Sequence, residues 1–244
     1  MQRKIKVFVI NLARSPERRK SMQKQLESFA GELDFFFFKA IDGQQDEHLA
    51  FAQHLCPNVT LAYKGRDLTT SEKACFASHY SLWQKCVALD EPILVLEDDV
   101  VFGDGFMEGI KDILNCKHEY VRFRCTFLTK FYPLSGPFRL SLGKAGGTQG
   151  YYLTPQGALK FLDRSKRWFC PVDDYMDMFF FNKVPIILYE RFLLDFSEDQ
   201  ETTIGQRRRK TKLPLKLMRE FMRIVRFCYR NFYVLLNRRK LLSL

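Results

Sequence analysis

The chain has 244 residues, of which 46% are hydrophobic and 15% aromatic, so it can bury a substantial core, and a fully disordered chain is excluded. Its formal net charge is +11, yet residues 205–244 alone carry thirteen Lys and Arg against one acid and amount to +12. Residues 1–204 are therefore left at −1, which excludes a general basic field over the body of the protein.

The cysteines and the apolar runs give expectations about the compartment. Seven cysteines without a CxxC pair suit reduced thiols in a cytoplasmic protein better than a disulfide framework or a structural zinc site. The apolar part of MQRKIKVFVINL is short and lacks a small-residue cleavage site, so we expect a first strand there rather than a signal peptide. No apolar run approaches the roughly 20 residues of a transmembrane helix.

The amino-terminal segment alternates between strand and helix patterns. A strand is predicted over 5–11, and a helix over 16–29 follows, with Ser15 placed as its N-cap. The LDFFFFK run predicts a second strand over 33–39 that is buried on both faces. Such alternation favours an α/β fold.

A long helix is predicted over 69–89, because Thr69 and Glu72 form a capping-box pattern at its start. The next strand is predicted over 92–96. It ends directly before the acids of the run ILVLEDDVVF.

Glu97, Asp98 and Asp99 interrupt this apolar run. Adjacent carboxylates repel one another, and a carboxylate removed from water without a partner is costly, so a cation would relieve both effects. The alternative is that the strand simply ends and the acids form a solvated turn. In open α/β sheets ligands bind at the carboxyl ends of strands, and Mg²⁺ or Mn²⁺ is commonly held by one or two carboxylates together with substrate phosphates. The position of the triplet therefore favours a divalent metal and phosphate chemistry.

The second half of the chain continues the mixture of strands and helices. Glycines at 146, 147 and 150 indicate a turn before the next strand. Thr154 with Pro155 marks the start of another helix. The remaining predicted elements are an apolar stretch at 110–114 and strands at 120–127, 138–142 and 151–153.

Residues 205–244 form a basic appendage with helical periodicity, in which cations recur on one face and apolar residues on the opposite face. Such a helix fits an anionic membrane surface. The alternatives are a helix docked on the body with its charged face in solvent, and a nucleic-acid-binding segment, which is the weakest because no base-stacking pattern accompanies the charge. The cations are Lys212, Lys216, Arg219, Arg223, Arg226 and Arg230, and the apolar residues are Leu217, Phe221, Ile224, Val225, Cys228 and Phe232.

Five motifs follow one another between residues 5 and 204, namely INLARSPERR, LTTSEKACFASHYSLW, VLEDDV, GTQGYYLT and PVDDYMD. In this order and spacing they resemble glycosyltransferase family 25, which includes bacterial lipooligosaccharide galactosyltransferases. The resemblance implies an α/β, GT-A-like catalytic domain over 1–204, with a Rossmann-like mixed sheet flanked by helices. It also implies a UDP-sugar donor, usually UDP-galactose or a related UDP-hexose, and inversion at the anomeric carbon. The appendage looks like those of relatives that work at the cytoplasmic face of the membrane.

Carried over residue by residue, the resemblance places the Mn²⁺ or Mg²⁺ ion at the acidic triplet. Asp99 is the preferred metal ligand, and Glu97 or Asp98 would meet the donor ribose or a metal-bound water. Many GT-A enzymes supply a late histidine to the metal, but none occurs here after His118. Water, the diphosphate or Gln200 would then complete the coordination.

Other residues match segments expected beside the donor. Asn11, Leu12 and Arg14 follow the first strand, and Arg14 is a candidate phosphate contact. By contrast, Arg18 and Arg19 are interpreted as solvated helix charges.

Two further segments that are candidates for contact with the donor lie in the middle of the chain. Ser78 and His79 match a Ser-His pair of the family, and His79 is either a structural histidine or a contact with donor or metal. Gly147, Thr148 and Gly150 match a GT-x-GY segment in which glycines let the backbone approach a sugar closely, although simple turn chemistry explains them almost as well.

An inverting transferase needs one general base on the acceptor side of the donor. PVDDYMD offers Asp173, Asp174 and Asp177. The resemblance aligns Asp173 with the family acid, so Asp173 is the preferred base and Asp174 the second candidate. The alternative is that these acids only stabilise the start of a helix through its dipole.

The sequence therefore predicts a metal-dependent, inverting UDP-hexose glycosyltransferase that moves galactose or glucose to a lipooligosaccharide or lipopolysaccharide acceptor. Its other expected partner is the anionic surface of the inner membrane, so it would be cytoplasmic and peripheral on the inner face of a bacterial inner membrane, without a nucleic-acid partner. The alternative from a different class is a catalytically inactive α/β protein that binds membrane or nucleic acid through its basic tail. A sugar nucleotidyltransferase is a weaker rival, because INLARSPERR lacks a glycine-rich nucleotide loop.

Overall fold

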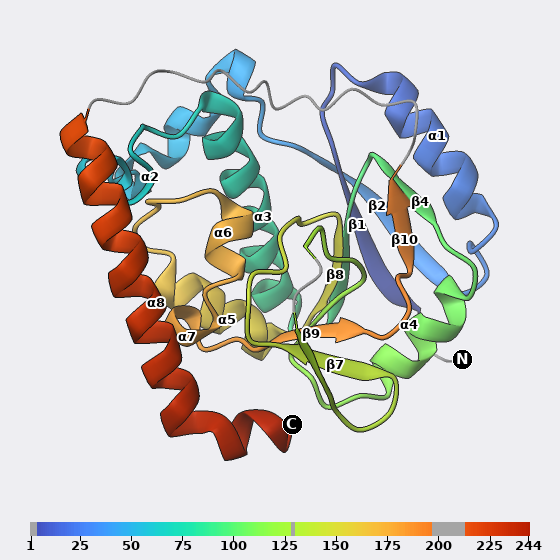
Figure 1. Ribbon diagram of the computed structural model, residues 1–244. Helices are drawn as coiled ribbons and strands as arrows, with labels where there is room; N and C mark the ends of the chain where they lie inside the picture. The colour runs from blue at the N-terminus through green and yellow to red at the C-terminus, as the bar shows by residue number, and fades with distance from the viewer. Residues whose placement is uncertain (1–3, 128–129, 197–212) are drawn as a thin grey trace.

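A mixed β-sheet flanked by helices on both faces forms the body of the protein in the computed structural model, which describes residues 4–127, 130–196 and 213–244 (Figure 1). Within these residues the main sheet has eight strands in the order β2-β1-β3-β8-β5-β9-β7-β6, and β4 pairs with β10 in a second, antiparallel sheet. The predicted α/β class and mixed sheet are confirmed. The strands are β1 (Ile5–Asn11), β2 (Leu33–Lys39), β3 (Ile93–Glu97), β4 (Val100–Phe102), β5 (Tyr120–Arg122), β6 (Phe131–Pro133), β7 (Phe138–Ser141), β8 (Gly150–Leu153), β9 (Ile186–Tyr189) and β10 (Leu194–Phe196).

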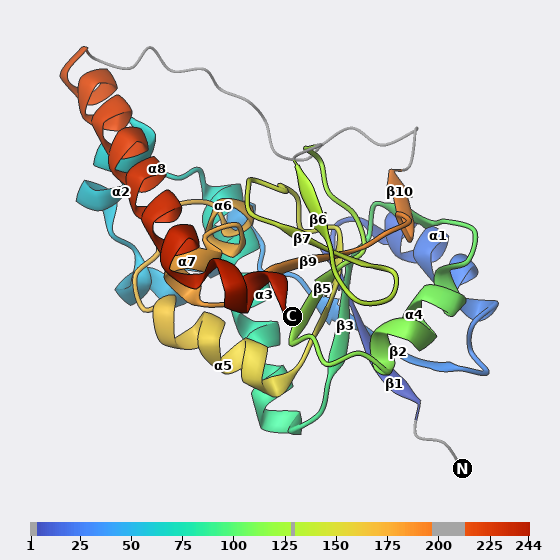
Figure 2. The ribbon, with the colours of Figure 1, turned by 60° about the horizontal axis from the view of Figure 1, so that its bottom comes forward.

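Helices cover both faces of the sheet, with α3 and α5 on one side of β1 and β3, and α1 and α4 on the other (Figure 2). Two 3₁₀ segments, Gly43–Gln45 and Glu47–His54, follow β2. The helices are α1 (Pro16–Glu27), α2 (Pro57–Lys64), α3 (Thr70–Leu89), α4 (Phe106–Leu114), α5 (Pro155–Arg164), α6 (Val172–Met176), α7 (Phe179–Asn182) and α8 (Leu213–Leu242).

The chain order reverses around β1, which pairs in parallel with β2 on one side and with β3 on the other. In such sheets the crevice at the carboxyl ends of the strands, where the order reverses, is where ligands bind. Those ends are Asn11 in β1 and Glu97 in β3. The fold thus brings two predicted site segments to one edge of the sheet.

The predicted capping box fixes the start of α3, the helix that carries Ser78 and His79. Glu72 N donates to Thr69 Oγ1 at 3.1 Å, and Thr69 N donates to Glu72 Oε2 at 2.8 Å. The predicted cap of α5 is also confirmed, since Thr154 Oγ1 accepts from Gly157 N. Both caps remove unsatisfied backbone donors at helix starts.

Three local predictions need correction. The strand β2 is not buried on both faces, because it lies at the edge of the sheet and leaves Phe36 42% exposed. Ser15 occupies the N-cap position of α1, but its side chain makes no capping hydrogen bond. The strand predicted over 120–127 ends after Arg122, where the chain leaves the ladder for a loop.

The predicted C-terminal helix is confirmed as α8, which lies along α2 and α7 (Figure 1). Its inner side packs on the body: Tyr229 and Tyr233 make edge contacts with Phe180 and Phe179 at ring separations of 5.7 and 6.0 Å, and Leu241 is buried. The predicted boundary at residue 204 and Lys212 lie outside the described residues. No helix in the described part of the chain has the length and apolarity needed to cross a bilayer.

The faces of α8 are oriented differently from the docked-helix alternative. The cationic residues Arg219, Arg226 and Arg230 are half-buried toward the body, whereas apolar residues such as Leu217 and Phe221 are exposed. The alternative of a docked helix with its charged face in solvent is therefore right about docking and wrong about the charged face.

Candidate functional site

A cavity of about 120 Å³ lies beside the carboxyl ends of β1 and β3, and we call it the carboxyl-end cavity. Its lining joins predicted residues from three separate segments with other residues that the sequence did not indicate. The predicted lining residues are Leu12, Arg14, Ser78, His79, Glu97, Asp98 and Asp99, and the additional ones used below are Arg18, Asp42 and Cys75.

Asp98 is held in place by two donors. Asn11 Nδ2 donates to Asp98 Oδ2 at 2.6 Å, and Arg18 Nη1 donates to Asp98 Oδ1 at 3.3 Å. The interpretation of Arg18 as a solvated charge is therefore wrong: its side chain is only 17% exposed, because the first turns of α1 face the triplet. Arg19 is exposed, with its guanidinium 4.2 Å from the centre of the Phe37 ring.

Asp99 has an oxygen that the protein leaves unsatisfied. Its Oδ1 is buried and has no hydrogen-bond partner among the described residues. Burial, and then the charges of Glu97 and Asp98, raise the pKa of Asp99 to about 7. A bound cation would offset both effects, so Asp99 fits the part of a metal ligand.

The described residues alone would not complete the coordination of a metal at Asp99. Among the described residues no group of three or more His, Cys, Asp and Glu is arranged to hold an ion, and Gln200 lies outside those residues. One or two carboxylates completed by water and substrate phosphates is the usual arrangement for Mg²⁺.

Glu97 joins the acidic triplet to the glycine-containing loop before β8. Thr148 donates its hydroxyl hydrogen to Glu97, and Glu97 N donates to the Gln149 carbonyl at 2.9 Å. Burial opposes ionisation of Glu97, but the hydrogen bonds and charges of His79 and then Thr148 outweigh it and lower the pKa. These interactions favour the ionised form of Glu97, and the hydrogen bond from Thr148 joins its side chain to the loop.

His79 belongs to a buried chain of polar groups. Trp83 Nε1 donates to the Tyr151 hydroxyl at 3.1 Å, and that oxygen lies 3.0 Å from His79 Nδ1. In the tautomer in which Tyr151 donates to Nδ1, Nε2 carries the proton and faces Glu97 Oε1 at 3.6 Å. His79 Nε2 therefore lies near Glu97 without a hydrogen-bond partner among the described residues, and no local pattern predicted the contacts of Trp83 and Tyr151 with this histidine.

The loop itself is fixed by a buried ion pair that sequence reasoning missed. Arg122 Nη1 donates to the carbonyls of Gly146 and Gly147 at 2.9 and 3.0 Å, and Arg122 Nη2 lies 2.9 Å from Asp177 Oδ1. Gly147 has a φ of +73°, and a Cβ there would lie 2.2 Å from Gln149 Oε1. An arginine inside an apolar strand was the signal available in the sequence.

Two predicted residues have structural roles. Ser78 Oγ accepts from Ile41 N at 2.9 Å and donates to the Ala74 carbonyl at 3.0 Å, so it fixes the wall after β2. Gly150 lies within the sheet, where a Cβ would come within 2.4 Å of Leu194 Cδ1. Its glycine identity is therefore explained by packing.

The neighbours Asp173 and Asp174 on α6 have different surroundings. Asp174 accepts from Lys64 Nζ at 2.7 Å and lies 2.8 Å from Lys144 Nζ, and it faces away from the carboxyl-end cavity. Asp173 has no ion pair in the described part of the chain, and burial followed by the charge of Asp174 raises its pKa. Of the two, Asp173 is the stronger proton acceptor.

The charges of Asp173 and of the acidic triplet both act on Cys75, which lines the carboxyl-end cavity. Burial raises the pKa of the Cys75 thiol, and the charges of Glu97, Asp173 and Asp99 raise it further, in that order. Each of the three carboxylates therefore disfavours the thiolate form of the half-buried Cys75.

Comparison with known proteins gives one family. The model of "Glycosyltransferase family 25 (LPS biosynthesis protein)" matches residues 4–176. A glycosyltransferase 25 family member of Aedes aegypti is 31% identical over 189 residues, and a human protein named inactive glycosyltransferase 25 family member 3 is 32% identical over 188. The matches cover 72% and 71% of this chain but 31% of each relative, so the chain spans about a third of their length.

Among solved structures, a glycosyltransferase involved in the glycosylation of the major capsid of PBCV-1 matches 91% of this chain and 100% of its own. The sequence identity is 10% and the TM-score 0.47.

Proposed function

The chain belongs to glycosyltransferase family 25, and from this premise we propose that it is a metal-assisted, inverting hexosyltransferase that uses a UDP-sugar and a lipooligosaccharide or lipopolysaccharide acceptor. Glycosyl transfer is the general chemistry of the family. What we propose beyond it is the transferred sugar, galactose or glucose, the metal and the acceptor. The observation that carries the proposal is the buried, unpartnered oxygen of Asp99 at the point where strand order reverses.

The residues around the carboxyl-end cavity suit a nucleotide diphosphate. Arg14 Nε donates to Asp42 Oδ2 at 2.9 Å, which keeps its guanidinium in the cavity wall, where its other N–H groups could meet an anion. Asp99, with Glu97 as the second candidate, would hold Mn²⁺ or Mg²⁺, which when bound supplies positive charge where the departing UDP becomes negative. Glu97 accepts a hydrogen bond from Thr148, and the buried His79 lies near it.

Asp173 is proposed as the general base. In an inverting transfer the acceptor hydroxyl gives its proton to the base while its oxygen bonds to the anomeric carbon and the bond to UDP breaks. Asp173 forms no ion pair among the described residues, although the charges of Lys144 and Arg122 act on it, whereas Asp174 is held directly by Lys64 and Lys144.

Donor hydrolysis tests the proposal without a known acceptor. We expect the full chain with Mn²⁺ to release UDP from UDP-galactose or UDP-glucose, and a chelator to abolish the release, because the leaving diphosphate then lacks its counter-charge. GDP-mannose is the control donor. Since one human relative is named inactive, the opposite result has a clear meaning: no binding of UDP-sugars at millimolar concentration would favour an inactive binding protein.

The proposed location is an anionic membrane surface, reached through the outer side of α8. Its exposed residues include Leu217 at 65%, Phe221 at 60%, Ile224 at 62% and Phe232 at 58%. Monomeric soluble proteins rarely expose a contiguous apolar stripe of this kind, and exposed cations at both ends of the helix would meet anionic headgroups.

Replacing Phe221, Ile224 and Phe232 together with Ser should reduce binding to phosphatidylglycerol vesicles by at least about tenfold, because each loses apolar area that would enter the interface. Sedimentation with vesicles measures this. The control carries Ser at Leu49 and Leu159, which are 57% and 52% exposed but lie elsewhere. Equal binding of both variants would refute a membrane role for this face.

A further inference from the structure

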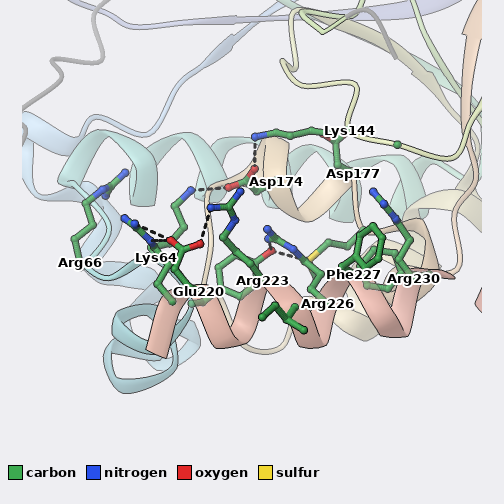
Figure 3. A pocket seen from close by; sticks show the side chains of 16 residues that line it. Lys64, Arg66, Lys144, Asp174, Asp177, Glu220, Arg223, Arg226, Phe227 and Arg230 are labelled. Carbon is green, nitrogen blue, oxygen red and sulfur yellow. Dashed lines mark hydrogen bonds and ion pairs between the residues drawn. The ribbon is translucent and has the colours of Figure 1, made fainter. Parts of the chain in front are cut away.

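A second cavity, of about 860 Å³, lies between α8 and the body, and we call it the basic cavity (Figure 3). Among its described lining residues seven are cationic and three acidic, so the cavity has an excess of four positive charges. Cations come from both of its walls, which are Arg219, Arg223, Arg226 and Arg230 on α8 and Lys64, Arg66 and Lys144 on the body.

The acids in the basic cavity are too few for these cations. Figure 3 shows Asp174 between Lys64 and Lys144, with nitrogen–oxygen distances of 2.7 and 2.8 Å. Glu220 is likewise shared between Arg219 and Arg223, at 2.8 and 2.7 Å.

The other pairs in this region do not change the balance. Asp177 lines the cavity and pairs with Arg122, which does not line it. Arg66 lines the cavity and pairs with Glu72 at 2.6 Å, and Glu72 does not line it. The carboxylates of Asp177 and Glu72 are therefore already paired with Arg122 and Arg66, and neither pairs with an arginine of α8.

Arg226 and Arg230 have no carboxylate partner in the described part of the chain. The Arg226 guanidinium lies 4.7 Å from the centre of the Tyr63 ring and donates to the Tyr63 hydroxyl. Arg230 Nε is buried and has no hydrogen-bond partner among the described residues. Two like charges one helical turn apart, both turned toward the protein, disfavour the docked position of α8 unless an anion lies between the helix and the body.

We propose that the basic cavity binds the phosphate-bearing part of the acceptor, a phosphorylated glycan, with Arg226 and Arg230 contacting the phosphate oxygens. This inference rests on the proposed transferase function. Guanidinium groups bind phosphate through paired hydrogen bonds, and the aromatic rings of Tyr63, Phe180 and Phe227 give the cavity apolar walls beside its charges.

The position of α6 favours an acceptor over other phosphates. Asp174 lines the basic cavity, and the adjacent Asp173 on α6 is the proposed base. A glycan anchored by phosphate at α8 can therefore extend past α6 to present a hydroxyl to Asp173. The donor diphosphate is proposed to bind in the carboxyl-end cavity, which shares no described lining residue with the basic cavity.

The test is calorimetric titration of a hexose 6-phosphate into the full chain and into two paired variants. Arg226→Gln/Arg230→Gln should bind the probe at least about tenfold more weakly, because two charged hydrogen-bond donors are lost. The matched control is Arg238→Gln/Arg239→Gln, which removes the same charge from exposed positions on α8 outside the cavity and should change the affinity less than about twofold. Thermal unfolding checks the fold, and Arg226→Lys/Arg230→Lys, which keeps the charge, should regain part of the lost affinity.

Four results would overturn the assignment. If both Gln variants bound the probe equally weakly, the probe would be held by the overall positive charge and not by Arg226 and Arg230. If inorganic phosphate bound as tightly as the sugar phosphate, the cavity would not recognise a glycan. Displacement of the probe by UDP would place it in the carboxyl-end cavity. Loss of phosphatidylglycerol vesicle binding in Arg226→Gln/Arg230→Gln, with unchanged affinity for the probe, would assign these cations to lipid headgroups.

Failure of this inference is distinguishable from failure of the proposed function. UDP-sugar hydrolysis without hexose phosphate binding would refute the acceptor site alone. Hexose phosphate binding that depends on Arg226 and Arg230, without any UDP-sugar hydrolysis, would refute the transferase alone.

Discussion

Replacing Asp99 with Asn should lower sugar transfer by about 10² to 10⁴, because a metal at the leaving diphosphate is worth several kcal/mol in the transition state. Asn keeps the size of the side chain but lacks the charge that would hold the ion at the buried Oδ1. UDP binding, measured by calorimetry with and without Mn²⁺, should lose its dependence on the metal in this variant.

The fold of Asp99→Asn should be intact. The substitution removes one of three adjacent carboxylates, so its midpoint of thermal unfolding should equal or exceed that of the wild type. Asp104→Asn, at an exposed position after β4, is the matched control and should transfer sugar normally. Transfer by Asp99→Asn at close to the wild-type rate would remove the metal from this position.

Asp173→Asn should lower the transfer rate by about 10² to 10⁴ while leaving UDP-sugar binding unchanged, since the loss of a positioned base affects the reaction and not the donor site. Because burial and Asp174 raise the pKa of Asp173 above its ordinary value of 3.8, the wild-type rate should fall as pH decreases through that raised pKa, where the base becomes protonated. The pH profile of kcat measures this.

Asp174→Asn is the neighbouring control with a different expected result. The Asp174 carboxylate forms ion pairs with Lys64 and with Lys144, whose side chain is half exposed. The variant should therefore lose about 1–3 kcal/mol in the free energy of unfolding. Its kcat should stay within about tenfold of the wild-type value. The reverse pattern between the two variants would move the base to Asp174. Full activity in both would exclude α6 from the chemistry.

Local patterns in the sequence determined the elements that depend on neighbouring residues. The capping box of Thr69 and Glu72, the cap at Thr154 and the strand before Glu97 need only contacts a few residues apart, and the structure has each of them. The parallel order around β1 also follows from strands that alternate with helices, because parallel strands need crossover connections. That is why the acidic triplet was expected at a ligand-binding edge.

The partners of charged side chains were decided only by the tertiary structure. Arg18 was interpreted as solvated because a surface helix carries such charges, yet it faces Asp98, 80 positions away along the chain. Arg122 pairs with Asp177 and fixes the Gly146–Gly147 turn, a contact between separate strand and helix segments that no local pattern encodes.

The orientation of α8 was also decided only by the tertiary structure. Its periodicity gave the two faces of the helix, one basic and one apolar, since a helix repeats every 3.6 residues whatever surrounds it. Which face meets the body depends on Tyr63, Phe179 and Phe180, which lie far away in the sequence. These aromatic contacts turn the cations inward and the apolar stripe outward, because a helix with two distinct faces can dock by either one and only the surface opposite it selects between them.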